Sequence, residues 1–209
     1  MSFQIDLTPE QIRARLSGEM STETNQFHLE FPQLLDILPD EAKPAAVLIP
    51  LQCIRGKWHV LFTRRNAKLL EHSGQVAFPG GRSDPEDPDP ETTAIRETWE
   101  EIGIKPSDIE VLGRLPSLLT ITNYLVTPIV GNIPYPYIYH PAIDEVSRIF
   151  TIPLDWLADP KNHEVRQRVL PAPFDPVSVI YFHEYDGEVL WGASARFTMS
   201  LLKILCQVE

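Results

Sequence analysis

The sequence is poor in cysteine and has fewer basic than acidic residues. Its 209 residues include two cysteines, Cys53 and Cys206. Because these lie far apart and within apolar segments, we expect buried free thiols, and neither a disulfide nor a zinc site is supported. Lysine and arginine total 18 against 29 acidic residues, which gives a net charge of −11. This balance argues against an extended nucleic-acid-binding surface.

Long apolar runs and targeting signals are also missing. No segment approaches the roughly 20 apolar residues that a membrane-spanning helix needs. The N-terminus lacks the apolar core of a signal peptide, and the C-terminus carries no peroxisomal address. We therefore expect a cytoplasmic protein without membrane contact.

The chain is long enough for one sizeable core preceded by a short appendage. Thr8, a following proline and Gln11 mark a helix start with a capping box. The residues after this helix, up to about 43, are rich in turn formers. We expect residues 1–43 to form an N-terminal helix and a linker arm, and residues 44–209 to form one domain.

Within this domain, strand patterns lie on both sides of a central helix expected at about 90–102. An amphipathic helix at 193–205 closes the chain. This order predicts an α/β (α+β) protein with a mixed β-sheet between helices. The expected strands are 45–54, 58–63, 75–78, 109–116, 124–132, 146–152, 165–170, 177–184 and 188–191.

Three glutamates at helical spacing carry most of the chemical information. Glu97, Glu100 and Glu101 share one face of a helix. Their repulsion costs about 0.2–0.5 kcal/mol per pair on an exposed helix, and Arg96 offsets only part of it. A divalent cation such as Mg²⁺ would convert this repulsion into ligation, because it takes oxygen ligands. A solvated acidic helix face explains the same spacing, and spacing alone does not choose between the two.

The surrounding residues favour a site. Gly80 and Gly81 follow an apolar run and permit a tight turn. Asp89 is a good N-cap for the helix, and Gly103 is a plausible left-handed C-cap. A glycine turn, an acidic loop and a capped helix can aim several carboxylates at one point. Such a site would repel a phosphate substrate unless cations bound first, so the composition favours a cation-dependent phosphate enzyme.

This segment resembles the signature of the nudix hydrolases. That signature is a glycine, five residues, a glutamate, seven residues, Arg-Glu, an apolar residue, any residue, Glu-Glu, any residue, a glycine and an apolar residue. The spacing from Gly81 to Arg96 is one residue longer, Asp87 replaces the first glutamate, and Thr98 replaces an apolar residue. The positions that match in register are Arg96, Glu97, Glu100, Glu101, Gly103 and Ile104.

The long loop and its aspartate also resemble one subfamily, the coenzyme A diphosphatases. Residues 61–65 and 72–84 are similar to two upstream elements of that subfamily. Asn66 departs from its usual serine or alanine, and Leu70 stands where an arginine is frequent. Downstream segments are similar too, so the resemblance covers roughly residues 44–207.

The resemblance implies a nudix-type α/β/α sandwich and a metal-dependent hydrolase. Its substrate would be coenzyme A or a short derivative, cleaved at the diphosphate bond into 3′,5′-ADP and a phosphopantetheine species. Glu97, Glu100 and Glu101 would hold Mg²⁺ or Mn²⁺, with Arg96 orienting them. Glu145 would be an extra ligand or the water-activating base.

Two arginines are candidates for contact with substrate phosphates. Arg64 and Arg65 carry guanidinium groups that suit phosphate oxygens. One of them could equally be an ordinary surface charge. Trp99 is expected to pack against the protein rather than to stack on a base.

Other functions stay open. A nudix hydrolase acting on ADP-ribose or another nucleoside diphosphate derivative is one, because Asn66 and Leu70 break the narrower pattern. A nucleotide-binding module without turnover is another, although it has no need for the intact glutamate triplet. The sequence also leaves a homodimer open.

Overall fold

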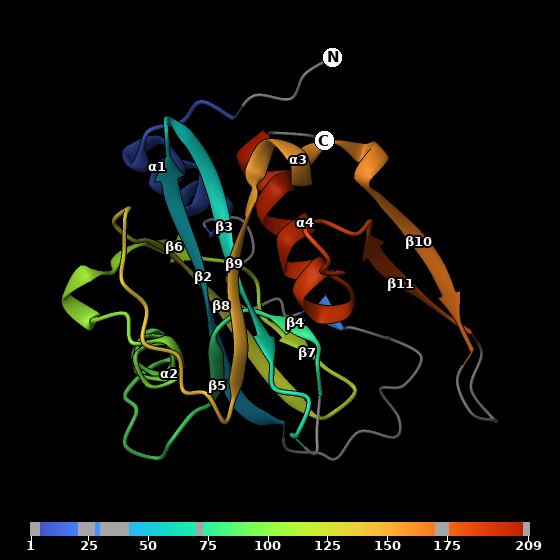
Figure 1. Cartoon of the computed structure of the whole chain (residues 1–209), viewed down its shortest axis with the longest axis horizontal. Helices are drawn as coiled ribbons and strands as arrows, with labels where there is room; N and C mark the ends of the chain where they lie inside the picture. Colours follow the sequence, from blue (N-terminus) through green and yellow to red (C-terminus); the bar gives the residue numbers. More distant parts are fainter. Residues whose placement is uncertain (1–4, 21–27, 30–41, 70–72, 170–175, 207–209) are drawn as a thin grey trace.

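The computed structural model describes residues 5–20, 28–29, 42–69, 73–169 and 176–206 (Figure 1). Within these residues, none of the helices combines the length and the apolar character needed to cross a membrane. Leu70 lies outside the described residues, as does most of the expected linker arm. The helices are α1 (Pro9–Met20), α2 (Pro90–Ile102), α3 (Leu154–Ala158) and α4 (Gly192–Cys206), with 3₁₀ turns η2 (Pro106–Asp108) and η3 (Pro160–Asn162).

A nine-stranded mixed sheet forms the centre of the described structure. Strand β2 runs parallel to β8 and antiparallel to both β3 and β5, and β9 pairs antiparallel with β3. The strands of this sheet are β1 (His28–Leu29), β2 (Lys43–Ile54), β3 (Lys57–Arg65), β4 (Val76–Ala77), β5 (Gly80–Arg82), β6 (Glu110–Arg114), β7 (Leu118–Leu119), β8 (Tyr124–Asn132) and β9 (Val146–Pro153).

The two faces of this sheet are covered by different helices. Side chains alternate along a strand, so Ile49 and Leu51 of β2 join the core cluster that contains residues of α1, α3 and α4. Ala46 and Leu48 instead join the cluster that contains residues of α2. Figure 1 accordingly shows α2 on one side of the sheet and α4 on the other. The predicted mixed sheet between helices is confirmed.

A second, two-stranded antiparallel sheet consists of β10 (His163–Arg168) and β11 (Val177–Phe182). It stands apart from the main sheet, next to α4 (Figure 1). The strand expected at 188–191 is wrong, since this segment makes only isolated bridges, between Trp191 and Tyr181 and between Glu188 and Tyr185. The segment is too short for a ladder because a turn precedes it and α4 begins at Gly192.

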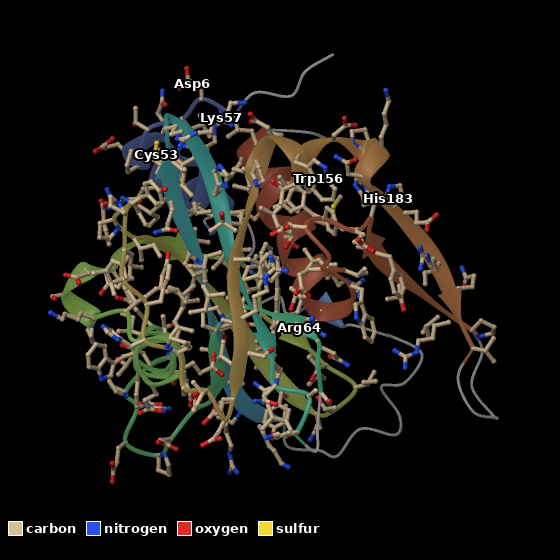
Figure 2. All side chains as sticks on the ribbon, in the orientation of Figure 1. Asp6, Cys53, Lys57, Arg64, Trp156 and His183 are labelled. Atoms are coloured by element: carbon tan, nitrogen blue, oxygen red, sulfur yellow. The ribbon has the colours of Figure 1, made fainter. Side chains whose placement is uncertain are left out.

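Two expectations about burial are also wrong. Cys53 is exposed, because it lies near the end of β2, beside the turn that leads into β3 (Figure 2). Cys206 is partly buried, and both thiols are free as expected. Trp99 packs only in part and is not buried as expected, since 45% of its surface is exposed.

The expected N-terminal helix is present and contributes to the core. It continues past Gly18 to Met20. Ile12 and Leu16 are fully or almost fully buried and belong to the same cluster as residues of α4. The division of the chain at residue 43 stays a prediction.

Candidate active site

The helix that carries the three glutamates is fixed at both ends by local signals. The side chain of Asp89 accepts a hydrogen bond from the Thr92 N–H at 2.8 Å, and Pro90 is the first helical residue. Gly103 adopts a left-handed φ of 73° and donates its N–H to the Trp99 carbonyl. Helix α2 therefore has the bounds and caps that the sequence predicts.

Two glycines let the backbone approach this helix closely. A Cβ at Gly80, whose φ is 152°, would lie 2.4 Å from the Ala46 carbonyl oxygen. A Cβ at Gly81 would lie 2.5 Å from Glu97 Oε2. The Glu97 carboxylate therefore occupies the space that a side chain at position 81 would need.

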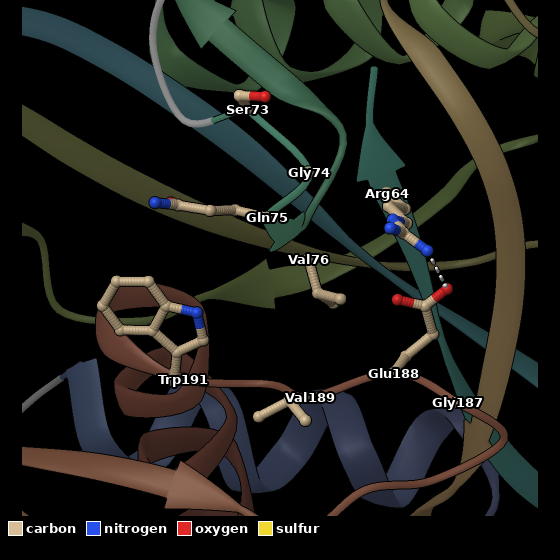
Figure 3. Close-up of a pocket in the computed structure, with 9 residues that line it drawn as sticks. All are labelled: Arg64, Ser73, Gly74, Gln75, Val76, Gly187, Glu188, Val189 and Trp191. Carbon is tan, nitrogen blue, oxygen red and sulfur yellow. Dashed lines mark hydrogen bonds and ion pairs between the residues drawn. The ribbon is translucent and has the colours of Figure 1, made fainter. Parts of the chain in front are cut away.

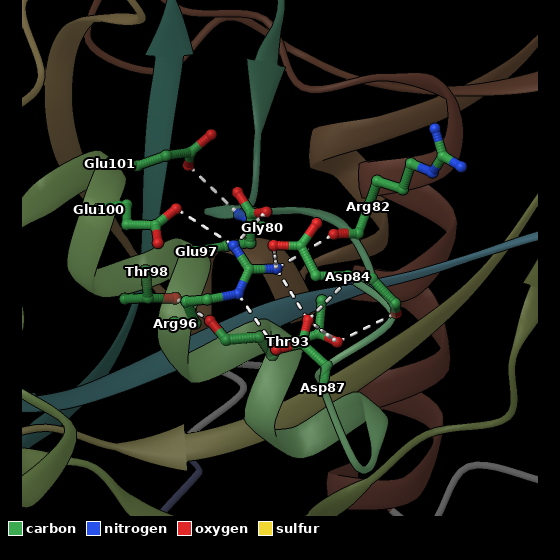
Figure 4. A network of polar contacts seen from close by, with 12 residues as sticks. Gly80, Arg82, Asp84, Asp87, Thr93, Arg96, Glu97, Thr98, Glu100 and Glu101 are labelled. Carbon is green, nitrogen blue, oxygen red and sulfur yellow. Dashed lines mark hydrogen bonds and ion pairs between the residues drawn. The ribbon is translucent and has the colours of Figure 1, made fainter.

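Arg96 is the centre of the polar network around these carboxylates (Figure 4). Its Nη2 and Nε lie 2.8 and 3.2 Å from the two carboxylate oxygens of Asp87. Its Nη1 lies 2.9 Å from Glu97 Oε1 and 3.1 Å from Glu100 Oε2. These hydrogen bonds hold the pKa of Asp87 well below its ordinary value. Arg96 thus ties the acidic loop to two of the three glutamates.

Glu101 is the buried member of the triplet, with 4% of its surface exposed. Its Oε2 accepts a hydrogen bond from the Gly80 N–H at 3.2 Å, and its Oε1 lies 3.7 Å from Arg65 Nη1. Burial raises the pKa of Glu101 to about 8, although Arg65 and the Gly80 N–H lower it. Burial also raises the pKa of Glu97, against the influence of Arg96.

Glu145 belongs to this cluster although it is distant in sequence. Its charge contributes to the raised pKa of Glu97 and of Glu101, so it lies within electrostatic reach of both. The loop before it is bound to the end of α2, where the Ala142 N–H donates to the Glu101 carbonyl at 2.8 Å. Asn66 holds the same loop, because its N–H donates to the Glu145 carbonyl at 2.7 Å.

The amide side chain of Asn66 donates to the Ile143 carbonyl at 2.8 Å. The residue that departs from the subfamily pattern thus has a structural use, which is to hold the loop that ends at Glu145.

The two candidate arginines lie at different cavities. Arg65 lines a cavity of about 520 Å³ together with Gly80 and Gly81. Arg64 lines another cavity, of about 420 Å³, where its Nη1 lies 3.4 Å from Glu188 Oε1 (Figure 3). The structure therefore brings Arg65, but not Arg64, to the glutamates.

The larger cavity also contains residues that the sequence reasoning missed. Arg82, Arg168 and Trp191 line it. The alternation of Arg166 and Arg168 could have indicated a basic strand face. No local signal shows that this strand comes to lie beside the glycine turn.

The described residues do not form a preformed metal cage. In the part of the chain that the structure describes, no three His, Cys, Asp or Glu side chains are gathered so that they could hold an ion. Glu97 and Glu100 instead share the guanidinium of Arg96. The metal ligands therefore stay a prediction.

Comparison with known proteins identifies the family. The NUDIX domain family matches residues 42–192. The chain belongs to the Nudix hydrolases. It is therefore an enzyme that acts on diphosphate bonds, and such enzymes generally need divalent metal ions.

Its relatives include two proteins named uncharacterized Nudix hydrolase NudL. The protein from Photorhabdus laumondii is 38% identical over 185 residues, which are 87% of this chain and 95% of the relative. The protein from Pectobacterium atrosepticum is 36% identical over 184 residues, which are 84% of this chain and 89% of the relative.

Solved structures of Nudix proteins are more distant. An Ap4A hydrolase from C. elegans in a binary complex is 23% identical, has a TM-score of 0.46, and covers 53% of this chain and 80% of its own. RenU from M. smegmatis is 21% identical, has a TM-score of 0.44, and covers 57% of this chain and 76% of its own.

Proposed function

We propose that this Nudix hydrolase cleaves the diphosphate bond of coenzyme A or of a short coenzyme A derivative. The observation that carries this proposal is the 520 Å³ cavity, which is lined by Gly80 and Gly81 and gives a nucleotide room beside the glutamates. Water would add to one phosphorus while the bridging P–O bond breaks. The products are 3′,5′-ADP and a phosphopantetheine species, and two protons are released once both new phosphate monoesters are fully ionised.

We assign the metal site to Glu97, Glu100 and Glu101, which would hold Mg²⁺ or Mn²⁺. Their carboxylate oxygens are ligands that hard divalent cations take, and the missing side chain at Gly81 leaves room for Glu97. A bound ion would neutralise the diphosphate and lower the pKa of a coordinated water. Arg96 keeps Glu97 and Glu100 together through charge-assisted hydrogen bonds.

Two further residues complete the proposed site. Arg65 would donate to a diphosphate oxygen, since its guanidinium lies beside Glu101 and lines the cavity. Glu145 would act as an extra metal ligand or as the base that takes the proton from water. Loss of a base flattens the acid limb of the pH–rate profile, whereas loss of a ligand raises the metal concentration needed for half-maximal rate.

ADP-ribose or another nucleoside diphosphate derivative is the rival substrate. The presence of Asn66 in place of serine or alanine is no longer an argument for this rival substrate. The hydrogen bonds of Asn66 to the 143–145 segment explain this difference from the subfamily without reference to substrate. Binding without turnover is the other alternative, and the intact triplet argues against it. The cytoplasmic location and a homodimer stay predictions.

A substrate panel tests the proposal. Coenzyme A, 3′-dephospho-coenzyme A and ADP-ribose are incubated with and without Mn²⁺, and the products are separated by chromatography. We expect the highest kcat/KM for coenzyme A, and only with metal. Faster turnover of ADP-ribose would replace the substrate, and hydrolysis of none of the three would overturn the proposal.

A further inference from the structure

The 520 Å³ cavity has a second wall that comes from the C-terminal part of the chain. Val177 and Val179 of β11 and Trp191, just before α4, line it. Val47 and Phe78 of the main sheet region line it as well. The cavity therefore joins an apolar lining to the glycine turn of the active site.

Arg168 is held in place on this second wall. Its guanidinium carbon lies 5.2 Å from the centroid of the Trp191 ring. Trp191 in turn stacks on Tyr181, with ring centroids 5.5 Å apart and an angle of 4° between the planes. Stacking orients a guanidinium and leaves its N–H edge available for hydrogen bonds. Arg168 is thus an exposed side chain whose guanidinium is oriented by the Trp191 ring.

Arg82, the last residue of β5, lines the same cavity. Its main-chain carbonyl accepts a hydrogen bond from Arg96 Nη2 at 3.2 Å, while its guanidinium points away from the carboxylates (Figure 4). Over the described ranges, neither Arg82 nor Arg168 forms an ion pair with a carboxylate. Carboxylates are abundant, with 29 acidic against 18 basic residues. Two exposed guanidinium groups on one cavity, with no carboxylate partner among the described residues, point to an anionic ligand.

We infer that Arg82 and Arg168 bind a phosphate group of the substrate other than the scissile diphosphate. The inference rests on the proposed function, which puts the diphosphate beside the glutamates. Amide and hydroxyl groups of a substrate carry no charge and would not require two guanidinium groups. A phosphate group, in contrast, matches the forked arrangement of guanidinium N–H donors. In a nucleoside diphosphate derivative, a further phosphate is an ester of the ribose. The apolar lining then receives the base and sugar.

Binding of two mononucleotides to the metal-free protein tests this subsite. 5′-AMP and 3′,5′-ADP share the base, the ribose and the 5′-phosphate, so the ratio of their Kd values isolates the extra phosphate. In EDTA, calorimetry should show about tenfold tighter binding of 3′,5′-ADP, which corresponds to about 1.4 kcal/mol. R168A and R82A should each reduce the ratio to about three or less. Equal affinities in the wild-type protein would overturn the inference.

Arg166 provides a matched control. It lies on the same strand, its guanidinium carbon is 4.7 Å from the Tyr181 centroid, and it pairs with Glu164 at 2.6 Å, outside the cavity lining. R166A should keep the wild-type ratio, and R168K should give an intermediate one. An equal loss in R166A and R168A would mean a general charge effect and would overturn the inference.

The test also separates this inference from the proposed function. Binding in EDTA requires no turnover. A ratio near one in an active enzyme rejects the phosphate subsite alone. A tenfold ratio in a protein that hydrolyses none of the panel rejects the proposed function alone.

Discussion

The glycine turn, which lies against Glu97 of α2, and the wall formed by β10, β11 and Trp191 border one cavity but are built in different ways. The first carries carboxylates and is held by short-range bonds, such as those between Asp87 and Arg96, nine residues apart. The second carries arginines and aromatic rings, and Tyr181 and Trp191 reach each other through an isolated bridge. The glutamate triplet and Arg96 thus come from a local motif, whereas Arg168 and Trp191 reach the cavity through tertiary structure. If the two regions act separately, a change in one should leave the contribution of the other intact.

Removal of divalent metal should have the largest effect. We expect turnover to disappear after exhaustive EDTA treatment and to return with Mg²⁺ or Mn²⁺, because the glutamates repel a diphosphate without cations. Nucleotide binding through Arg82 and Arg168 should persist after the same treatment. Undiminished turnover in chelated protein would contradict the assigned role of the acidic region.

Glu100→Gln should lower kcat by at least about two orders of magnitude, comparable to the loss of a major electrostatic stabiliser. Its stability without metal should change little, because the lost Arg96 pair and the relieved repulsion are both small. Glu91→Gln is the matched control, since Glu91 is exposed in the first turn of the same helix. Similar kcat values in the two variants would favour a solvated acidic face.

Asp87→Asn should lower the free energy of unfolding at pH 7 by about 2 kcal/mol, in the range for hydrogen bonds to charged groups. The carboxylate side chain is only 6% exposed and meets Arg96 at two points. Arg96 lowers the folded-state pKa of Asp87, so this stability is present above the unfolded pKa of about 4 and is lost as pH falls below it.

Urea unfolding at pH 7 and pH 3 measures this difference, which should shrink at the lower pH. Asp84→Asn is the control, because its side chain is 61% exposed and lies 3.7 Å from Arg96. Exposed pairs of this kind contribute about 0–1 kcal/mol. A pH-independent loss in Asp87→Asn would show that the charge is not the cause.

Arg65→Ala should have the smallest effect, a decrease in kcat/KM of about tenfold, in keeping with one charged hydrogen bond. The decrease should be the same for coenzyme A and 3′-dephospho-coenzyme A, because Arg65 lies beside Glu101. Arg64→Ala should leave both values within about twofold, since Arg64 pairs with Glu188 elsewhere. If Arg65→Ala changed the ratio between the substrates, the ribose phosphate would belong to Arg65 instead.

Sequence reasoning succeeded where the determinants are local. The bounds of α2 were predicted because Asp89 and Gly103 cap it through their own backbone geometry. The glutamates and glycines of the candidate site follow from the same short segment. The bounds of β8 also agree with the expected range.

It failed where the environment is supplied by distant residues. An apolar pattern around Cys53 does not reveal that the strand end beside it is uncovered. Arg64 and Arg65 are neighbours, yet only the packing of β3 against β4 and β9 decides which of them meets Glu101. The place of Arg168 depends on the docking of β10 and β11, which no local pattern encodes.

Val47 lies where the two regions meet, because it pairs with the glycine turn and lines the cavity that both regions border. Its side chain lines the cavity, while its backbone pairs with Gly80, so closely that a Cβ at Gly80 would lie 2.5 Å from Val47 Cα. Substitutions at sites without shared neighbours usually have additive free energies, and those with shared neighbours do not. Double-mutant cycles between Glu100 and Arg168 should therefore give a coupling energy near zero. Cycles that include Val47 should show a coupling energy with either region, which makes this strand residue the natural position for changing rate and selectivity together.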